Sequence, residues 1–509
     1  MNKTKKKKKV LGLQDMEHYI APITTSLGKI GDTLTNFTID VGNTKNSISI
    51  ADILASCSNL SELTYSTNTA LSTPQTENDN NSSSRSKKLK NPHYSLQNLQ
   101  IRASSITGPD IDSILKYCSI LRRLVMNDCD PSVLDTIVNH PTPNLEILGY
   151  NRSDDSFPAP PLSVKKETAT YRRRYHHHHN NNNNNNKKRS KKQKMVGNLR
   201  ILHIANNSSK PIPAQNIIPL LYKNKKSLNY IMACISSITE TELEQFYAKY
   251  PDFQLHNVTR LIFWPYKGIQ ELMLHAVRDS TKLSFLHAVN AQDINVLITT
   301  LMEMPPLKRL SIKNPMRPST QTANTTTEVE SISSALYLNS LFKRYARISL
   351  SSPTTTMTTT TSPPPSSHLF KSLVLRGCNC ITDQELVTLA TIRTLKRVTF
   401  QKLINVSTHG LMTLFTQLDN QLTSIRLTEM KSATDDILSL LGDMDNLTCI
   451  KLEDLKQVTD QGIRVLVDKK KANNTIRLME FFVYKCPSIT PECMIYVKQK
   501  IPMAVISAH

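Results

Sequence analysis

Cysteine and histidine are the side chains of this sequence best suited to metal binding or nucleophilic chemistry. The 509 residues include nine Cys and 14 His. Cys378 and Cys380 are two residues apart, and Cys486 and Cys493 are seven apart, so neither pair has the spacing of a common zinc site. The sequence also shows no Gly-rich phosphate loop, no His-Glu-x-x-His helix motif and no nucleophile elbow. We therefore expect a protein that is not an enzyme and that binds no cofactor or metal.

The positions of the cysteines indicate packing instead. Cys57 and Cys118 each precede a leucine by three residues, and Cys129, Cys378 and Cys486 each follow an apolar residue by eight. A buried thiol acts as a small apolar side chain at such a regular place. The N-terminus carries no secretory segment, which favours a reducing compartment, the cytoplasm or the nucleus, and free thiols.

Most of the net charge of +22 lies in polar segments at residues 1–9, 75–91 and 151–195. Two basic runs are candidate nuclear-import signals, although loose phosphate binding and a purely solvated charge run are alternatives. Their residues are Lys5, Lys6, Lys7, Lys8, Lys9, Lys187, Lys188, Arg189, Lys191 and Lys192. Because few aromatic residues accompany these runs, specific nucleic-acid binding is not expected. The histidines at 176–179 adjoin an Asn tract, which favours low-complexity sequence over a metal site.

The strands and helices that position the remaining side chains are predicted from a repeated sequence pattern. Five apolar anchors near the C-terminus, separated by 25, 27, 25 and 31 residues, begin similar units: Phe370, Leu395, Leu422, Leu447 and Leu478. After each anchor, apolar and variable residues alternate, which is typical of a strand. A Thr or Ser then follows twelve residues after the anchor, and it starts a helix in each unit. Thr382 with Glu385 forms a capping box, and Pro491 suits a first helical position. Each unit is thus a strand, a turn and a helix.

The run FKSLVLRGCNCITDQELVTLA, at 370–390, resembles the cysteine-containing leucine-rich repeats of F-box/leucine-rich-repeat proteins and of the mitotic-exit-network antagonist family. The resemblance implies an α/β leucine-rich-repeat solenoid with a curved parallel sheet on its concave face and helices on its convex face. It also implies a protein-binding scaffold that recognises substrates for an SCF-type ubiquitin ligase, with cullin-RING subunits among its partners.

One feature of that family is not expected here. Nothing between Val10 and Leu34 has the length or pattern of the F-box that docks on the ligase adaptor. The alternative is therefore an F-box-less repeat protein that binds and inhibits or scaffolds a cell-cycle or signalling partner. A GTPase activator is less compatible, because its repeats are usually longer than those seen here.

Weaker copies of the pattern extend the array toward the N-terminus, with polar insertions between blocks. We expect a basic tail at 1–9, repeats at 10–72, 93–150, 198–316 and 368–509, and a weak repeat at 336–350. The predicted disordered insertions or loops lie at 73–92, 151–197, 317–335 and 351–367.

The concave face is the expected binding surface, for a protein partner rather than for nucleic acid or a membrane. Parallel strands stack equivalent residues into rows. One row reads Val374, Thr399, Arg426, Lys451 and Phe482, and the next Arg376, Gln401, Thr428, Glu453 and Tyr484. Aromatic and Arg side chains often dominate binding energy, so partner contact is one interpretation of these rows. Burial of the aromatic rings in the core is the other. Arg260 and Trp264 occupy the same class of position.

Overall fold

A computed structural model describes residues 9–12, 25–27, 29–41, 50–67, 93, 95–103, 106–140, 144–152, 197–206, 211–291, 293–314, 326–350, 369–472, 478–502 and 504–508. The chain forms two compact units. Unit 1 comprises residues 1–198 and 205–210, and unit 2 comprises 199–204 and 211–509.

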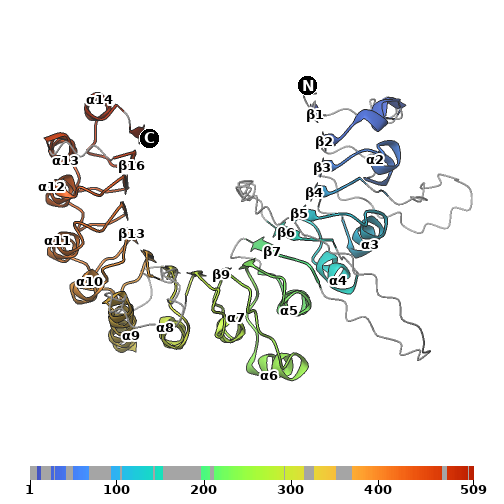
Figure 1. Cartoon of the computed structure of the whole chain (residues 1–509), viewed down its shortest axis with the longest axis horizontal. Coiled ribbons are helices and arrows are strands. Elements are labelled where there is room, and N and C mark those ends of the chain that lie inside the picture. Colours follow the sequence, from blue (N-terminus) through green and yellow to red (C-terminus); the bar gives the residue numbers. More distant parts are fainter. Residues whose placement is uncertain are drawn as a thin grey trace, which may run out of the picture. The chain divides into compact units, whose positions relative to one another are not determined.

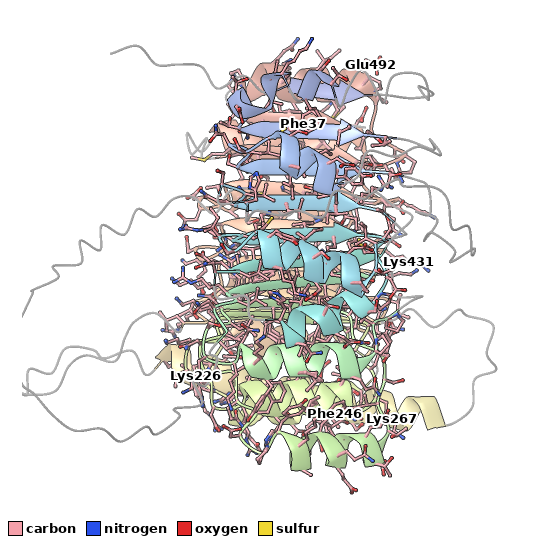
Figure 2. The ribbon with its side chains drawn as sticks, turned by 90° about the vertical axis from the view of Figure 1, so that its right-hand side faces the viewer. Phe37, Lys226, Phe246, Lys267, Lys431 and Glu492 are labelled. Carbon is pink, nitrogen blue, oxygen red and sulfur yellow. The ribbon has the colours of Figure 1, made fainter. Side chains whose placement is uncertain are left out.

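Unit 1 is a ladder of parallel strands with helices along one side (Figure 1). Its elements are β1 (Lys9–Gly12), η2 (Gly31–Thr33), β2 (Asn36–Asp40), α2 (Ile50–Ser56), β3 (Glu62–Ser66), β4 (Asn98–Arg102), α3 (Gly108–Tyr117), β5 (Arg123–Asn127), α4 (Ser132–Asn139) and β6 (Ile147–Arg152). Figure 2 shows these strands stacked one above another, with Phe37 on β2.

Unit 2 repeats the same alternation of strand and helix. Its elements are β7 (Ile201–Asn206), α5 (Ala214–Lys223), β8 (Tyr230–Ala233), α6 (Glu240–Lys249), β9 (Arg260–Phe263), α7 (Ile269–Val277), β10 (Phe285–Val289), α8 (Ile294–Glu303), β11 (Arg309–Lys313), α9 (Thr326–Leu350), β12 (Ser372–Arg376), α10 (Asp383–Ala390), β13 (Arg397–Gln401), α11 (Thr408–Gln417), β14 (Ser424–Thr428), α12 (Asp435–Asp443), β15 (Cys449–Glu453), α13 (Asp460–Ala472), β16 (Glu480–Tyr484), α14 (Pro491–Lys500) and β17 (Val505–Ala508).

The strands of unit 2 line the inner side of an arc, and the helices line its outer side (Figure 1). Each strand from β7 to β17 pairs in parallel with the next one along the chain. The predicted fold class, an α/β leucine-rich-repeat solenoid with a curved parallel sheet, is confirmed.

Alternating burial along the strands explains where the core lies. In β12 and β15 the two leucine or isoleucine side chains are buried, and the residues beside them are partly exposed. The buried face of each strand packs against the apolar side chains of the helices, such as Leu386 and Leu389 of α10, so the core runs between the strand layer and the helix layer. The other face of each strand points away from the helices, and most of its side chains are exposed or half-buried, with exceptions such as buried Val125, Ser311 and Thr428.

Several predicted helix starts are confirmed. Thr382 begins α10 with a capping box in which Thr382 N–H and Oγ1 donate to Glu385 at 2.9 and 2.6 Å. Thr239 begins α6 through the same arrangement with Glu242. Pro491 is the first residue of α14. The capping signature therefore locates helix starts in this repeat.

The chain leaves many strands through a left-handed residue. Positive φ angles between 50° and 62° occur directly after β5, β10, β12, β13, β14, β15 and β16. The residues there are Asp128, Asn290, Gly377, Lys402, Glu429, Asp454 and Lys485. Only Gly377 adopts this conformation without a steric cost from its side chain. The turn therefore stores some backbone strain at the six positions where the residue is not glycine.

Three predicted boundaries differ from the structure. Lys9 belongs to β1 rather than to a tail, and residues 151 and 152 complete β6 rather than opening an insertion. Residues 326–350, expected as part of a Thr-rich loop and a weak repeat, form the single helix α9. The insertions at 73–92 and 351–367, and most of 151–197, lie outside the described residues.

Helix α9 is held in place by its C-terminal half. Arg344 Nη1 and Nη2 donate to the carbonyls of Leu301 and Met304, at the end of α8, at 2.8 and 2.7 Å. The ring of Tyr345 stacks on Phe370 with 4.4 Å between centroids. Strand β11 pairs directly with β12, so the expected weak repeat adds no strand to the sheet.

Tyr345→Phe tests the polar part of this packing. Leu307 N–H donates to Tyr345 Oη at 3.3 Å in a buried site, and burial raises the pKa of this phenol to about 12. We expect the substitution to lower the free energy of unfolding by about 1 kcal/mol, because a buried N–H loses its acceptor while the ring stacking remains. Urea denaturation measures the change. Tyr337→Phe, on the same helix but 42% exposed, is the control and should change stability little.

Candidate concave binding surface

The open face of the β12–β16 strands carries the two predicted rows. Backbone pairing aligns Val374, Thr399, Arg426, Lys451 and Phe482 as successive partners. It aligns Arg376, Gln401, Thr428, Glu453 and Tyr484 in the same way. The register of these rows follows from the apolar anchors. Their contact with a partner remains a prediction.

Charged side chains within the rows pair with one another toward the C-terminal end. Arg426 Nη2 lies 2.6 Å from Glu453 Oε2, and Thr428 Oγ1 donates to the same oxygen at 3.3 Å. These hydrogen bonds, led by that from Arg426, lower the pKa of the Glu453 carboxyl. Gln401 Nε2 also donates to Glu429 at 2.8 Å, just beyond β14. This part of the surface is therefore electrostatically balanced.

The aromatic end of the rows combines rings with lysines. Lys451 Nζ lies 4.3 Å from the centroid of the Phe482 ring and 3.2 Å from Glu480 Oε2. Phe482 is half-buried, whereas Tyr484 is 38% exposed, with Lys485 Nζ 5.1 Å from its ring. Neither ring is part of the core. Of the two rings, Tyr484 also has a polar hydroxyl group.

The other aromatic candidate lies inside the fold. Trp264, directly after β9, is 9% exposed and packs in a cluster with Cys234 and Val289. Its ring is therefore not available to a partner without rearrangement. Arg260, at the start of β9, is exposed.

A third row on this face was not recognised as a row from the sequence. Backbone pairing aligns Arg260, Phe285, Arg309, Ser372, Arg397, Ser424, Cys449 and Glu480 across β9–β16. Each of these residues lies two positions after an apolar anchor, and this spacing would have identified them. The row adds Arg309 and Arg397 to the candidate surface.

The five cysteines whose spacing predicts packing are buried, namely Cys57, Cys118, Cys129, Cys378 and Cys486. All nine are unpaired, and all except Cys449 are buried. Burial raises the pKa of the Cys118 and Cys234 thiols to about 12, and that of Cys57 to about 11, so they are poor nucleophiles at neutral pH. In the described part of the chain no group of His, Cys, Asp and Glu is arranged to hold a metal ion.

The remaining candidates lie elsewhere. Lys9 is part of β1, whereas Lys5–Lys8, the basic run at 187–192 and the histidines at 176–179 lie outside the described residues. None of the helices that the structure describes combines the length and apolar character needed to cross a membrane.

Comparison with known proteins adds a resemblance in architecture. No protein-family model matches the sequence, and a search of the curated proteins finds no match. The crystal structure of the Rad7 and Elc1 complex in yeast is similar, with a TM-score of 0.41 and 14% sequence identity over 81% of this chain and 80% of that chain. A likeness at this level transfers no function.

Proposed function

We propose that this chain is a protein-binding leucine-rich-repeat scaffold whose partner lies on the open strand face of unit 2. The observation that carries the proposal is the set of three aligned rows on that face, where Arg, Lys, Phe and Tyr side chains project from a rigid parallel sheet. These residue types supply most hot spots in protein interfaces. A rigid surface also loses little conformational entropy on binding.

The finer proposal is that the repeats recognise substrates for an SCF-type ubiquitin ligase. It rests on the sequence resemblance to F-box/leucine-rich-repeat proteins. The alternative is a repeat protein that binds and inhibits or scaffolds a cell-cycle or signalling partner without any ligase. The lack of an F-box pattern in the residues from Val10 to Leu34 motivates this alternative.

Affinity purification of the full chain separates the two. Recovery of a small adaptor together with a cullin supports the ligase proposal. Recovery of a partner without these subunits contradicts it and supports the alternative.

The double substitution Phe482→Ala with Tyr484→Ala tests the binding surface itself. We expect about a tenfold loss of affinity for the purified partner, because two aromatic contacts are removed. The unfolding midpoint should fall by only a few degrees, because neither ring belongs to the core. Binding is measured by calorimetry, and the unfolding midpoint by circular dichroism.

A matched control removes exposed apolar side chains outside the strands. Ile404 follows β13 and Met412 lies on α11, and both are exposed. Ile404→Ala with Met412→Ala should leave partner affinity unchanged. Equal losses in the two double variants would place the partner elsewhere. A large loss of stability in the first would mean that the rings support the fold.

A further inference from the structure

The open face of β9–β13 is positively charged and lacks acidic residues. We define the cationic strip as Arg260, Arg309, Lys313, Arg376 and Arg397. All five project from the strand face opposite the core, and all except half-buried Arg376 are exposed. The five strands themselves contain no Asp or Glu. Lys308, Lys371 and Lys396 directly precede β11, β12 and β13 and add to the positive charge.

The strip differs from the neighbouring strands because its cations form no ion pairs within the part of the chain that the structure describes; Glu453, which attracts Arg376 from β15, already pairs with Arg426. In β14–β16, Arg426 pairs with Glu453 and Lys451 with Glu480. Among the described residues, none of the five cations of the strip forms an ion pair. Lys313 and Arg376 are direct partners across β11 and β12. Like charges placed directly opposite each other destabilise a sheet, so folding alone does not explain this arrangement.

The electrostatics of the strip reflect this crowding. Burial, then Arg397 and Arg260, lower the pKa of the Arg309 guanidinium, which still remains protonated at neutral pH. Burial, followed by Arg376 and Lys313, lowers the pKa of His287 to about 4, so His287 is neutral at pH 7. An anion bound at this face would relieve the repulsion and would gain charge-assisted hydrogen bonds from the guanidinium groups.

We propose that the cationic strip binds an extended acidic segment of a protein partner, lying across the strands. This inference rests on the proposed function and specifies the chemistry of the partner. The middle row between the cations is composed of small and apolar residues, Ile262, Ser311, Val374 and Thr399, beside neutral His287. This row of small and apolar side chains leaves room for a peptide chain.

Nucleic acid fits this surface less well. Binders of single strands need exposed aromatic rings on which bases stack. On the open face of β9–β13 and the residue that follows β9, the aromatic rings are those of Phe285 and His287, both half-buried, and of buried Trp264, so none of them is exposed. Charge without a stacking platform therefore favours carboxylates over nucleotides.

The spacing of the arginines indicates a peptide pattern. Arg260, Arg309 and Arg397 recur at every second strand, because Phe285 and Ser372 lie between them. Two strand spacings are about 9.6 Å, and three residues of an extended chain in the polyproline II conformation span about 9.3 Å and bring side chains i and i+3 to the same side. Acidic residues at every third position of the partner segment would therefore match the row.

Fluorescence anisotropy with labelled peptides and the full-length protein tests the proposal. The probe is a peptide of five Glu-Gly-Ser repeats, and the comparison peptides replace Glu by Gln or cluster the five Glu residues at one end. We expect the repeat peptide to bind best and its affinity to fall as salt is raised. A Kd of about 1 mM corresponds to a binding free energy of about −4 kcal/mol. If no binding is detected at about 1 mM peptide and low salt, the proposal is overturned.

Arg309→Glu locates the site. We expect at least about a tenfold loss of peptide affinity, because the central attraction becomes repulsion. Arg309→Gln should give a smaller loss, and it serves if the Glu variant folds poorly by circular dichroism. Arg393→Glu makes the same charge change at an exposed residue between α10 and β13, outside the strip, and should retain affinity. Equal losses at Arg309 and Arg393 would mean that only net charge matters, which contradicts a site.

Two further outcomes separate the proposals. A single-stranded thymidine 20-mer that binds more tightly than the peptide, with the same dependence on Arg309, would show a nucleic-acid site instead. If the purified partner binds normally to Arg309→Glu but not to the Phe482→Ala and Tyr484→Ala variant, the proposed scaffold function stands and the acidic-segment inference is wrong.

Discussion

We expect Gly410→Ala to lower the free energy of unfolding by about 2 kcal/mol, although Ala usually stabilises a helix relative to Gly by about 1 kcal/mol. Gly410 is the third residue of α11 and is buried. A Cβ at this position would lie 2.0 Å from Asp383 Oδ1 and 2.4 Å from its Cγ. The Asp383 side chain would therefore have to leave its position, and the interactions it makes would be lost.

Asp383 joins two successive repeat units. It is the first residue of α10, and its carboxylate accepts hydrogen bonds from Ser407 N–H and Oγ at 2.8 and 2.5 Å. Ser407 in turn caps α11, because its Oγ accepts from Gly410 N–H at 3.1 Å. One carboxylate thus holds the start of the next helix, and charge-assisted hydrogen bonds of this kind are stronger than neutral ones.

The link recurs along the array. Asp435 accepts from Thr459 N–H and Oγ1, and Asp460 accepts from Thr490 in the same way. A Cβ on Gly462 would lie 2.1 Å from Asp435 Oδ1, so a second Gly leaves room for a second Asp. At the third link, Asp460 faces Cys493 instead of a glycine. The anchors of the two repeats joined there, Leu447 and Leu478, are 31 residues apart, and this longer repeat leaves room for a side chain.

A double-mutant cycle isolates this contact. Asp383→Gly removes the carboxylate and also the Cβ of residue 383, which would lie 3.0 Å from the new Cβ. In that background Gly410→Ala should raise the free energy of unfolding by about 1 kcal/mol, because only helix propensity remains. The sign of the Gly410→Ala effect therefore inverts between the two backgrounds. Urea denaturation of the four proteins measures it. The same sign in both backgrounds would show that the Asp383 carboxylate is not what excludes a side chain.

Much of the solenoid follows from short-range signals in the sequence. Each apolar anchor fixes which strand residues are buried. A shift of the strand register by one residue would turn all of its buried side chains to the exposed face. The rows through Val374 and Arg376 could therefore be aligned by counting from the anchors. The capping residues Thr382 and Thr239 locate helix starts because the hydrogen bonds they make are local.

Long-range features could not be predicted in this way. Helix α9 has no signal of its own, since its position depends on Arg344 and Tyr345 meeting α8 and the next unit. The burial of Trp264 depends on Cys234 and Val289, which belong to neighbouring units. The cationic strip results from which strands become neighbours, and composition alone does not reveal that its charges lack ion-pair partners among the described residues.

Lys470→Met is expected to stabilise the protein near pH 7 and to lose this advantage as the pH rises. The Lys470 side chain is 0% exposed and its ammonium donates to the carbonyl of Met444, at the end of α12. Burial lowers the pKa of Lys470 to about 8, against the opposing influence of Asp445, Asp419 and Asp443. The fold therefore holds a cation that would be better solvated in the unfolded chain.

The direction of the pH dependence follows from linkage. Folding lowers this pKa from 10.5 to about 8, so the unfolded chain binds more protons than the folded chain between these values. The free energy of unfolding of the wild type therefore rises with pH across this window, through this group, by about 2 to 3 kcal/mol. Met has a similar length and no charge, so Lys470→Met lacks this rise.

The decisive quantity is the difference in unfolding free energy between Lys470→Met and the wild type, measured from pH 7 to 10.5. Comparing two proteins at each pH cancels the titration of the other lysines and tyrosines. The stability of the variant relative to the wild type should fall by about 2 to 3 kcal/mol across this range, most of it above pH 8. Lys471→Met, at the exposed neighbouring position, should show a constant difference. If the difference for Lys470→Met is constant as well, Lys470 is not a buried cation whose pKa is lowered by folding. Such a group destabilises the fold below its folded-state pKa and stops doing so once it has lost its proton in both the folded and the unfolded chain.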